Sequence, residues 1–387
     1  MSLSSYEGLG QLLKGIDKVS IVYSVDPESI VASAAIASLA SAKEIDFELA
    51  PFYEAPKPAN STLLILVGVR QQRVVGGIKI KLLWDVLNAK KLLALKTIKE
   101  LKELWIVSPE QVALAIAATL ASFKGSNYDE RVLESVRNEL SDFIASGVVS
   151  IVERTLRLFR YPNARIMECL FRTIEPFIPA TSLRMDGSRS LIEQLGLPDK
   201  QGPLDEEEKK ALLKALSDKV ARSLGKHPQL EGSKVVVRCE DPVDVYELSY
   251  ALLSCIDVSK HELAISAFFN SKYFKALLAS LEKFYDRIAS FLEDVLLANL
   301  RPGRTYIRGV RVDQFEASAK DPLNTFSKLV YAHGIASGVT VFRVEDGYCL
   351  PMYEASPAWP SEALSELSIV NGCFCSSSMD KLIKVIA

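Results

Sequence analysis

Histidine is scarce in this chain: His227, His261 and His333 are the three histidines among 387 residues. All three lie in the second half of the sequence, far from the strands and helices expected near the N-terminus. A two-metal phosphoesterase site needs several nitrogen and oxygen ligands around ions about 4 Å apart. The N-terminal region therefore cannot supply imidazole ligands to such a site.

Cysteine pairs with metal-binding spacing are also missing. No C-x-x-C pair occurs, and Cys373 and Cys375 are separated by one residue, where zinc sites usually have two or more. We interpret the six cysteines as buried or idle thiols in a reducing compartment; they stand at positions 169, 239, 255, 349, 373 and 375.

Long apolar runs and a strong net charge are absent as well. No run reaches the ~18 uncharged apolar residues of a membrane span, and MSLSSYEGLGQLLKG at the start lacks the apolar core of a signal peptide. We expect a soluble, cytoplasmic protein. The 46 basic and 48 acidic residues leave a net charge of −2, so any contact with nucleic acid must come from a local patch.

Short apolar segments alternate with helical patterns in the first third of the sequence. Four segments rich in β-branched residues are typical of buried strands: 19–25, 45–52, 62–69 and 78–84. A small-residue helix follows Asp26, and a second helix over 108–123 begins with a Ser cap and Pro at N1. The pattern predicts an α/β fold with a mostly parallel sheet.

The rest of the chain suggests a connection and a second domain, since single cores stop growing near ~250–300 residues. We expect an N-terminal α/β domain over 1–150, a helical connecting region over 151–232 and a smaller C-terminal α/β domain over 233–387. The connection should contain a charged amphipathic helix at 204–224 and end in a linker at 225–233. In the C-terminal domain we expect one long helix over about 271–299 and a strand at RTYIRGVRVDQF, 304–315.

Asp26-Pro27-Glu28 follows the first expected strand and permits two interpretations. Two carboxylates at the end of a sheet strand are what a metal-dependent phosphoesterase would place there. They are equally what a helix needs to start, with Asp26 as N-cap, Pro27 at N1 and Glu28 at the positive end of the helix dipole. Asp85, after the fourth strand, is the third acid at a strand end and is expected to be a solvated turn residue.

These residues resemble the DHH phosphoesterase superfamily, in particular its RecJ-like branch. Asp26-Pro27-Glu28-Ser29-Ile30 falls on the first motif, D-x-D-(G/S)-I, with Glu in place of the second Asp. Val67 stands where the second motif has Asp, and Asp85-Val86-Leu87 stands where the family has Asp-His-His. The resemblance thus implies that Asp26, Glu28 and Asp85 are relics of a site for two manganese ions, and that Asp26 now caps a helix.

The likeness extends along the chain. IEPFIPATSLRMDGSRSLIEQLGL (174–197) is similar to an archaeal RecJ-like segment, whereas 345–356 and 370–386 lack the Arg-bearing strand and the Gly-Gly-His loop of the family's C-terminal domain. This pattern of loss is similar to the CDC forty-five type, which keeps the fold without the nuclease. The resemblance implies no catalytic residue, no metal and no cofactor, with GINS and MCM as partners in the replicative helicase of an archaeon and a nucleoid-associated location.

Arginines supply candidates for contact with single-stranded DNA or with a partner protein. Between 152 and 172 we expect a helix whose face carries Arg154, Arg157 and Arg160, followed by Arg165. Arg308 and Arg311 belong to the expected strand at 304–315, with Tyr306 and Arg308 on one face and Arg311 on the other. Solvated faces and a charge-protected edge strand explain the same residues without a ligand.

Two other functions remain open at this point. The protein could be an active manganese-dependent DHH-type single-strand nuclease or phosphoesterase with unusual ligands. It could also be an unrelated ligand-binding α/β protein.

Overall fold

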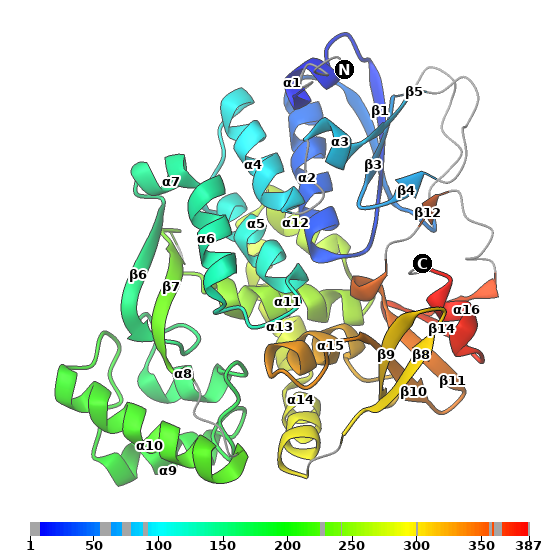
Figure 1. Ribbon diagram of the computed structural model, residues 1–387. Coiled ribbons are helices and arrows are strands. Elements are labelled where there is room, and N and C mark those ends of the chain that lie inside the picture. Colours follow the sequence, from blue (N-terminus) through cyan, green and yellow to red (C-terminus); the bar gives the residue numbers. More distant parts are fainter. Residues whose placement is uncertain are drawn as a thin grey trace.

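A parallel sheet and the helices around it form the first part of the chain, described from residue 8 to residue 145, which we call the first half of the molecule (Figure 1). The computed structural model describes residues 8–54, 63–71, 79–87, 92–224, 229–240, 242–298, 301–355, 358–359 and 366–385. The sheet has the order β2-β1-β3-β5, and every neighbouring pair is parallel. Its strands are β1 (Lys18–Tyr23), β2 (Asp46–Pro51), β3 (Leu63–Val67) and β5 (Lys79–Leu82). The four strands confirm the sequence prediction, except that 83–84 begin a helix and residues 62 and 78 lie outside the described part.

Helices cover this sheet because its two central strands are buried on both faces: all five residues of β3 and all but the first of β1 are buried. Helix α2 is buried along most of its length, since Ala and Ser let it approach its neighbours closely. Helix α5 begins with a capping box of Ser108 and Gln111, as its sequence predicts. The helices of this part are α1 (Leu9–Leu12), α2 (Pro27–Ala42), α3 (Leu83–Val86), α4 (Leu93–Leu104), α5 (Pro109–Ser122), α6 (Glu130–Glu139) and α7 (Ser141–Ala145).

The predicted helix over 152–172 is wrong for its first part. Strand β6 (Val149–Leu156) pairs antiparallel with β7 (Glu231–Val237), with an irregularity between Val152 and Thr155. The cause is tertiary: the β-branched runs of β6 and β7 pair with each other, and this outweighs the three-residue spacing of the arginines. Helix α8 (Ile166–Arg172) covers the end of the predicted range.

A second, smaller hydrophobic cluster lies beside the β6–β7 pair. It is built from α8, α9 (Met185–Leu195) and α10 (Glu206–Leu224), and α10 confirms the predicted charged amphipathic helix. Of the predicted linker, 225–228 with His227 lies outside the described residues, and residues 231–233 belong to β7. The proposed three-part division of the chain stays a prediction.

The second half of the molecule consists of the described residues between 242 and 385. It contains a six-stranded sheet of order β13-β14-β11-β10-β9-β8. Among its described strands, β9 and β10 are parallel neighbours joined by α15 (Leu323–Ala332), and the other neighbours are antiparallel. The strands are β8 (Gly303–Ile307), β9 (Val310–Glu316), β10 (Val339–Val344), β11 (Gly347–Pro351), β13 (Ser368–Val370) and β14 (Cys373–Ser376). The helices are α11 (Val245–Asp257), α12 (Glu262–Phe269), α13 (Phe274–Glu282), α14 (Tyr285–Leu292) and α16 (Met379–Ile383), with short turns at Ser271–Tyr273, Glu293–Leu297 and Met352–Glu354.

Two predictions for this half need correction. The long helix expected over 271–299 is divided into α13, α14 and a π-type turn, and residue 299 lies outside the described part. The chain leaves helical angles at Phe284, with φ −106° and ψ 3°; α13 packs on α11, and Phe291 of α14 stacks on Phe326 of α15 at 3.9 Å. The strand expected at 304–315 is a hairpin, because Arg308 and Gly309 both have positive φ, 50° and 79°, as a two-residue turn requires.

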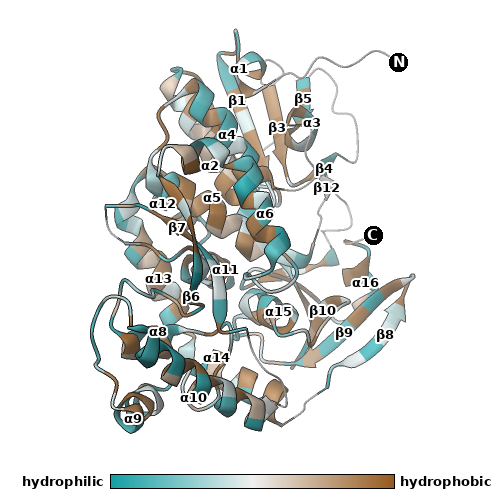
Figure 2. Ribbon diagram, turned by 60° about the vertical axis from the view of Figure 1, so that its left-hand side comes forward, coloured by the Kyte–Doolittle hydropathy of each residue, from teal (hydrophilic) through white to brown (hydrophobic). Residues whose placement is uncertain are grey.

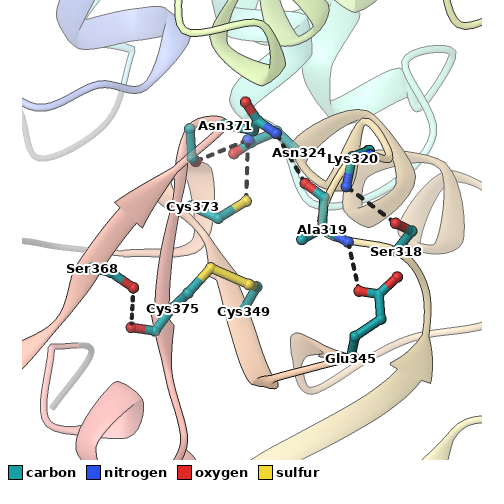
Figure 3. Close-up of a disulfide and its surroundings, with 11 residues drawn as sticks. Ser318, Ala319, Lys320, Asn324, Glu345, Cys349, Ser368, Asn371, Cys373 and Cys375 are labelled. Carbon is teal, nitrogen blue, oxygen red and sulfur yellow. Dashed lines mark hydrogen bonds between the residues drawn. A yellow bond between two sulfur atoms is a disulfide. The ribbon is translucent and has the colours of Figure 1, made fainter.

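The interpretation of all six cysteines as thiols is also wrong. Cys349 of β11 and Cys375 of β14 are directly paired across the strands and joined by a disulfide (Figure 3). Cys169, Cys239, Cys255 and Cys373 are free. The sequence offers no spacing signal for this bond, because the two cysteines meet only when β11 and β14 pair.

The second half packs against the carboxyl edge of the parallel sheet (Figure 1). Phe52, directly after β2, lies 5.9 Å from Phe374 of β14 between ring centroids, and Tyr23 at the end of β1 meets His261 edge-on at 5.8 Å. The two halves share one continuous hydrophobic core. The small β4 (Arg70–Gln71) and β12 (Ala358–Trp359) pair in parallel and add a main-chain link.

Phe374→Ala is expected to lower the free energy of unfolding by about 3–5 kcal/mol, because a fully buried aromatic ring would leave a cavity. Urea titration followed by tryptophan fluorescence measures the change. Ile106→Ala is the control, since Ile106 is 86% exposed and its loss should cost little. Equal stability of the two variants would mean that the ring at 374 does not hold the halves together.

Candidate functional site: the carboxyl edge of the parallel sheet

The ends of β1 and β3 meet at the start of α2. Asp26 has extended backbone angles and accepts a hydrogen bond from the Ser29 N–H at 3.0 Å, so it is the N-cap of α2. Gly68, after β3, has φ +67°, and a Cβ there would lie 1.9 Å from Ser29 Oγ. The close approach therefore requires glycine, and it places the end of β3 beside Asp26 and Ser29.

Glu28 lies in the first turn of α2 and also bonds to residues of α4 and α5. Its carboxylate accepts a hydrogen bond from the Thr119 hydroxyl at 3.0 Å, and the N–H groups of Leu92 and Leu93 also bond to it. Helix α4 begins at Leu93 and has no side-chain cap of its own. Glu28 thus serves the N-terminus of α4 as well as lying in the first turn of α2.

Burial sets the protonation of both carboxyl groups. It raises the pKa of Glu28 to about 7, helped by the neighbouring Asp26 charge and opposed by the hydrogen bonds from Thr119, Leu93 and Leu92. Burial also raises the pKa of Asp26, opposed by hydrogen bonds from Ser29 and Ser24. The pair can hold a proton near neutral pH.

The other relic positions do not join this pair. Val67 is fully buried, Val86 and Leu87 are buried, and Asp85 points outward from α3 as an exposed residue. In the described ranges, no three His, Cys, Asp or Glu side chains gather in a group suited to a metal ion. The residues at this edge do not fit a site for two manganese ions, because the carboxylates present bind helix N–H groups and the remaining positions are apolar.

The arginine series in the middle of the chain is divided by the fold. Arg154 lies exposed at the irregularity of β6, and Arg165 lies exposed before α8. Arg157 is buried, bonds to Gln229 Oε1 at 2.7 Å and lies over the ring of Tyr128. The three residues expected on one helix face therefore do not share a surface.

Arg160 belongs to an ion network that sequence reasoning missed. Its Nε lies 2.5 Å from Glu247 Oε2, and Arg172 Nη1 lies 2.9 Å from Glu247 Oε1. Both guanidinium groups also contact Glu168, at 2.8 and 3.0 Å. The i,i+4 spacing of Glu168 and Arg172 was the one available signal.

In the second half, Arg308 lies in the β8–β9 turn, which corrects its expected place on the strand face with Tyr306. It makes a bidentate pair with Asp380, both contacts at 2.9 Å. Arg311, on β9, lies 3.4 Å from Asp313. Whether these arginines, or Arg154 and Arg165, contact DNA or a partner stays a prediction.

The molecule is thus an α/β protein in which a mixed second sheet covers the carboxyl edge of a parallel sheet. This architecture is similar to the crystal structure of CDC45 from Entamoeba histolytica, with a TM-score of 0.56, 9% identity, and 88% of this chain and 87% of that chain covered. The chain has the CDC45 fold, and this confirms the fold that the sequence resemblance implies.

RecJ structures are also similar. RecJ from Thermus thermophilus in complex with Mn²⁺ matches with a TM-score of 0.40 and 13% identity over 95% of this chain, which spans 50% of that chain. Exonuclease RecJ bound to manganese matches with a TM-score of 0.40 and 12% identity over 91% of this chain and 83% of that chain. No family model and no curated protein sequence matches the chain.

Glu28→Gln is expected to raise the free energy of unfolding at pH 8 by on the order of 1–3 kcal/mol. The folded protein keeps the Glu28 proton up to a pH of about 7, whereas the unfolded chain releases it near 4.5. The wild type should therefore lose stability as the pH rises between these values, and the variant should lose less. Urea unfolding at pH 5 and pH 8 measures the difference.

Glu110→Gln is the matched control, because Glu110 is also the second residue of a helix that begins with a capping residue and Pro. Its pH dependence should follow that of the wild type. If Glu28→Gln follows it too, Glu28 is not the titrating group.

Proposed function

We propose that the protein is a non-catalytic DNA replication factor, a scaffold or activator of the replicative helicase that acts through GINS and MCM. One observation carries the proposal: the carboxyl edge where a RecJ-like nuclease would do its chemistry is filled. Asp26 and Glu28 serve two helix N-termini, and Phe374 and His261 of the second half pack on the strand ends.

The CDC45 fold supports a replication role, and the identity of the partners rests on the sequence resemblance. A cytoplasmic, nucleoid-associated location belongs to the same proposal. No helix in the described part of the chain is both long and apolar enough to cross a membrane.

The contact with GINS is expected to use the end of the second sheet. In the tail segment 368–375, Phe374 and Cys373 are buried in the core, whereas Ile369 and Val370 of β13 are 40% and 39% exposed. Two neighbouring exposed apolar residues would supply apolar area to the centre of such a contact.

One alternative keeps support from a specific feature. Two neighbouring carboxyl groups at a sheet edge favour a manganese-dependent nuclease or phosphoesterase with a reduced ligand set. No contact among the described residues favours an unrelated ligand-binding protein.

We expect no degradation of labelled single-stranded DNA with Mg²⁺ or Mn²⁺ at micromolar protein, because Val67, Val86 and Leu87 cannot bind the ions that would activate water. Gel electrophoresis over several hours tests this. The control is Asp26→Asn, which keeps the helix cap and removes the charge. Metal-dependent degradation by the wild type that Asp26→Asn abolishes would support the nuclease instead.

Mixing the protein with the GINS complex of the same organism should give one species on gel filtration, and that species should speed DNA unwinding by MCM. Ile369→Asp should weaken the complex roughly 10-fold or more, as loss of an interface anchor does. Val152→Asp is the matched control, since Val152 is 42% exposed on β6, and Figure 1 shows β6 on the opposite side of the molecule from β14, the neighbour of β13. Separate peaks for the wild type, with unchanged unwinding, would contradict the replication role.

A further inference from the structure

Strand β8 is the open edge of the second sheet. It pairs with β9 on one side and has no neighbour on the other in the described part of the sheet. Gly303, Arg304, Thr305 and Tyr306 are all exposed, and Tyr306 is 72% exposed. Figure 2 shows β8 along the outer border of the molecule.

The hairpin register shows which main-chain groups face outward. Ile307 and Val310 close a two-residue turn, so they exchange both main-chain hydrogen bonds, as do Thr305 with Val312 and Gly303 with Gln314. The N–H and C=O groups of Arg304 and Tyr306 therefore point away from β9. No hydrogen bond from either N–H to a described residue is found.

The same edge carries positive charge. Arg301, Arg304 and Arg308 occur within eight residues, and no acid interrupts them. Arg308 is held by Asp380, whereas Arg304 is 61% exposed and its Nε lies 3.6 Å from Asp313. Arg304 shares Asp313 Oδ1 with Arg311, whose Nε lies 3.4 Å from the same oxygen, while Oδ2 accepts the N–H groups of Ser337 and Gly338. Most of the exposed Arg304 guanidinium is therefore free to bind another acid.

We propose that β8 binds an extended acidic segment of a partner protein as a seventh strand of this sheet. Main-chain groups of the segment pair with Arg304 and Tyr306, its carboxylates pair with Arg304 and Arg301, and one of its apolar side chains packs on the Tyr306 ring. This inference is independent of the proposed replication role, because it uses neither β13 nor the carboxyl edge of the first sheet.

Nucleic acid fits the edge less well. Two outward main-chain donor and acceptor pairs, at residues 304 and 306, match the two-residue period of another β-strand and have no counterpart in a sugar-phosphate chain.

The test uses three probes with the full-length protein: a capped ten-residue peptide of alternating Glu and Val, the same peptide with Lys for Glu, and oligothymidine. Fluorescence anisotropy at low salt should show binding of the Glu peptide only. Amide hydrogen exchange of the wild type should slow at Arg304 and Tyr306 when that peptide is added, a readout that needs no variant. Lack of binding, lack of protection at these amides, or equal binding of either other probe would overturn the proposal.

Variants separate the main chain from the charge. Tyr306→Pro removes one outward N–H and should weaken peptide binding about 10-fold, whereas Tyr306→Ala keeps that N–H and should cost about 3-fold or less. Arg304→Glu should also weaken binding about 10-fold, and Arg304→Lys much less. Unchanged melting temperatures establish that the exposed edge, and not the fold, is altered; equal affinities of Tyr306→Pro and Tyr306→Ala would exclude strand addition.

Discussion

The packing of the second sheet on the carboxyl edge of the parallel sheet is the constraint on which the other features depend. At such an edge, helix N-termini and loop N–H groups converge, and in many α/β proteins they bind a ligand. Here Phe52 meets Phe374 and Tyr23 meets His261, so aromatic rings occupy that space and join both halves in one core. Polar groups left at the edge must therefore find partners within the protein.

Asp26 and Glu28 are explained by this requirement. The first turns of α2 and α4 leave N–H groups without partners inside their helices. Asp26 bonds to Ser29, while Glu28 accepts from Leu92, Leu93 and the Thr119 hydroxyl. Desolvation raises the pKa of each carboxyl group, because burial destabilises the charged form of both side chains. In place of a metal ion, the N-termini of α2 and α4 supply the positive potential that stabilises the charged carboxylates.

Local signals account for the parts of the fold that the sequence could predict. The central strands β1 and β3 are short apolar runs, and the starts of α2 and α5 carry Asp-Pro-Glu and Ser-Pro-Glu caps. The errors arise where a distant partner decides. Residues 152–156 become a strand because β7 lies beside them, and the second role of Glu28 depends on α4 and α5. The Arg308-Gly309 turn is different: its glycine was visible in the sequence, but the whole segment was interpreted as one charge-protected edge strand.

The arginines show why a count of basic residues does not locate a binding surface. Arg157 is buried with its guanidinium against Gly232, where a Cβ would approach within 2.4 Å of it, and Arg160 and Arg172 neutralise Glu247 inside the protein. All three arginines are already bound, and releasing Arg160 and Arg172 for a ligand would leave the buried Glu247 carboxylate unpaired at a cost of about 3–5 kcal/mol. Arg304 is the opposite case. The acid beside it, Asp313, is shared with main-chain donors, and the Arg304 side chain is mostly in solvent. The carboxyl edge of the parallel sheet is covered, whereas strand β8 at the open edge of the second sheet presents both an exposed arginine and unpaired main-chain groups to a partner.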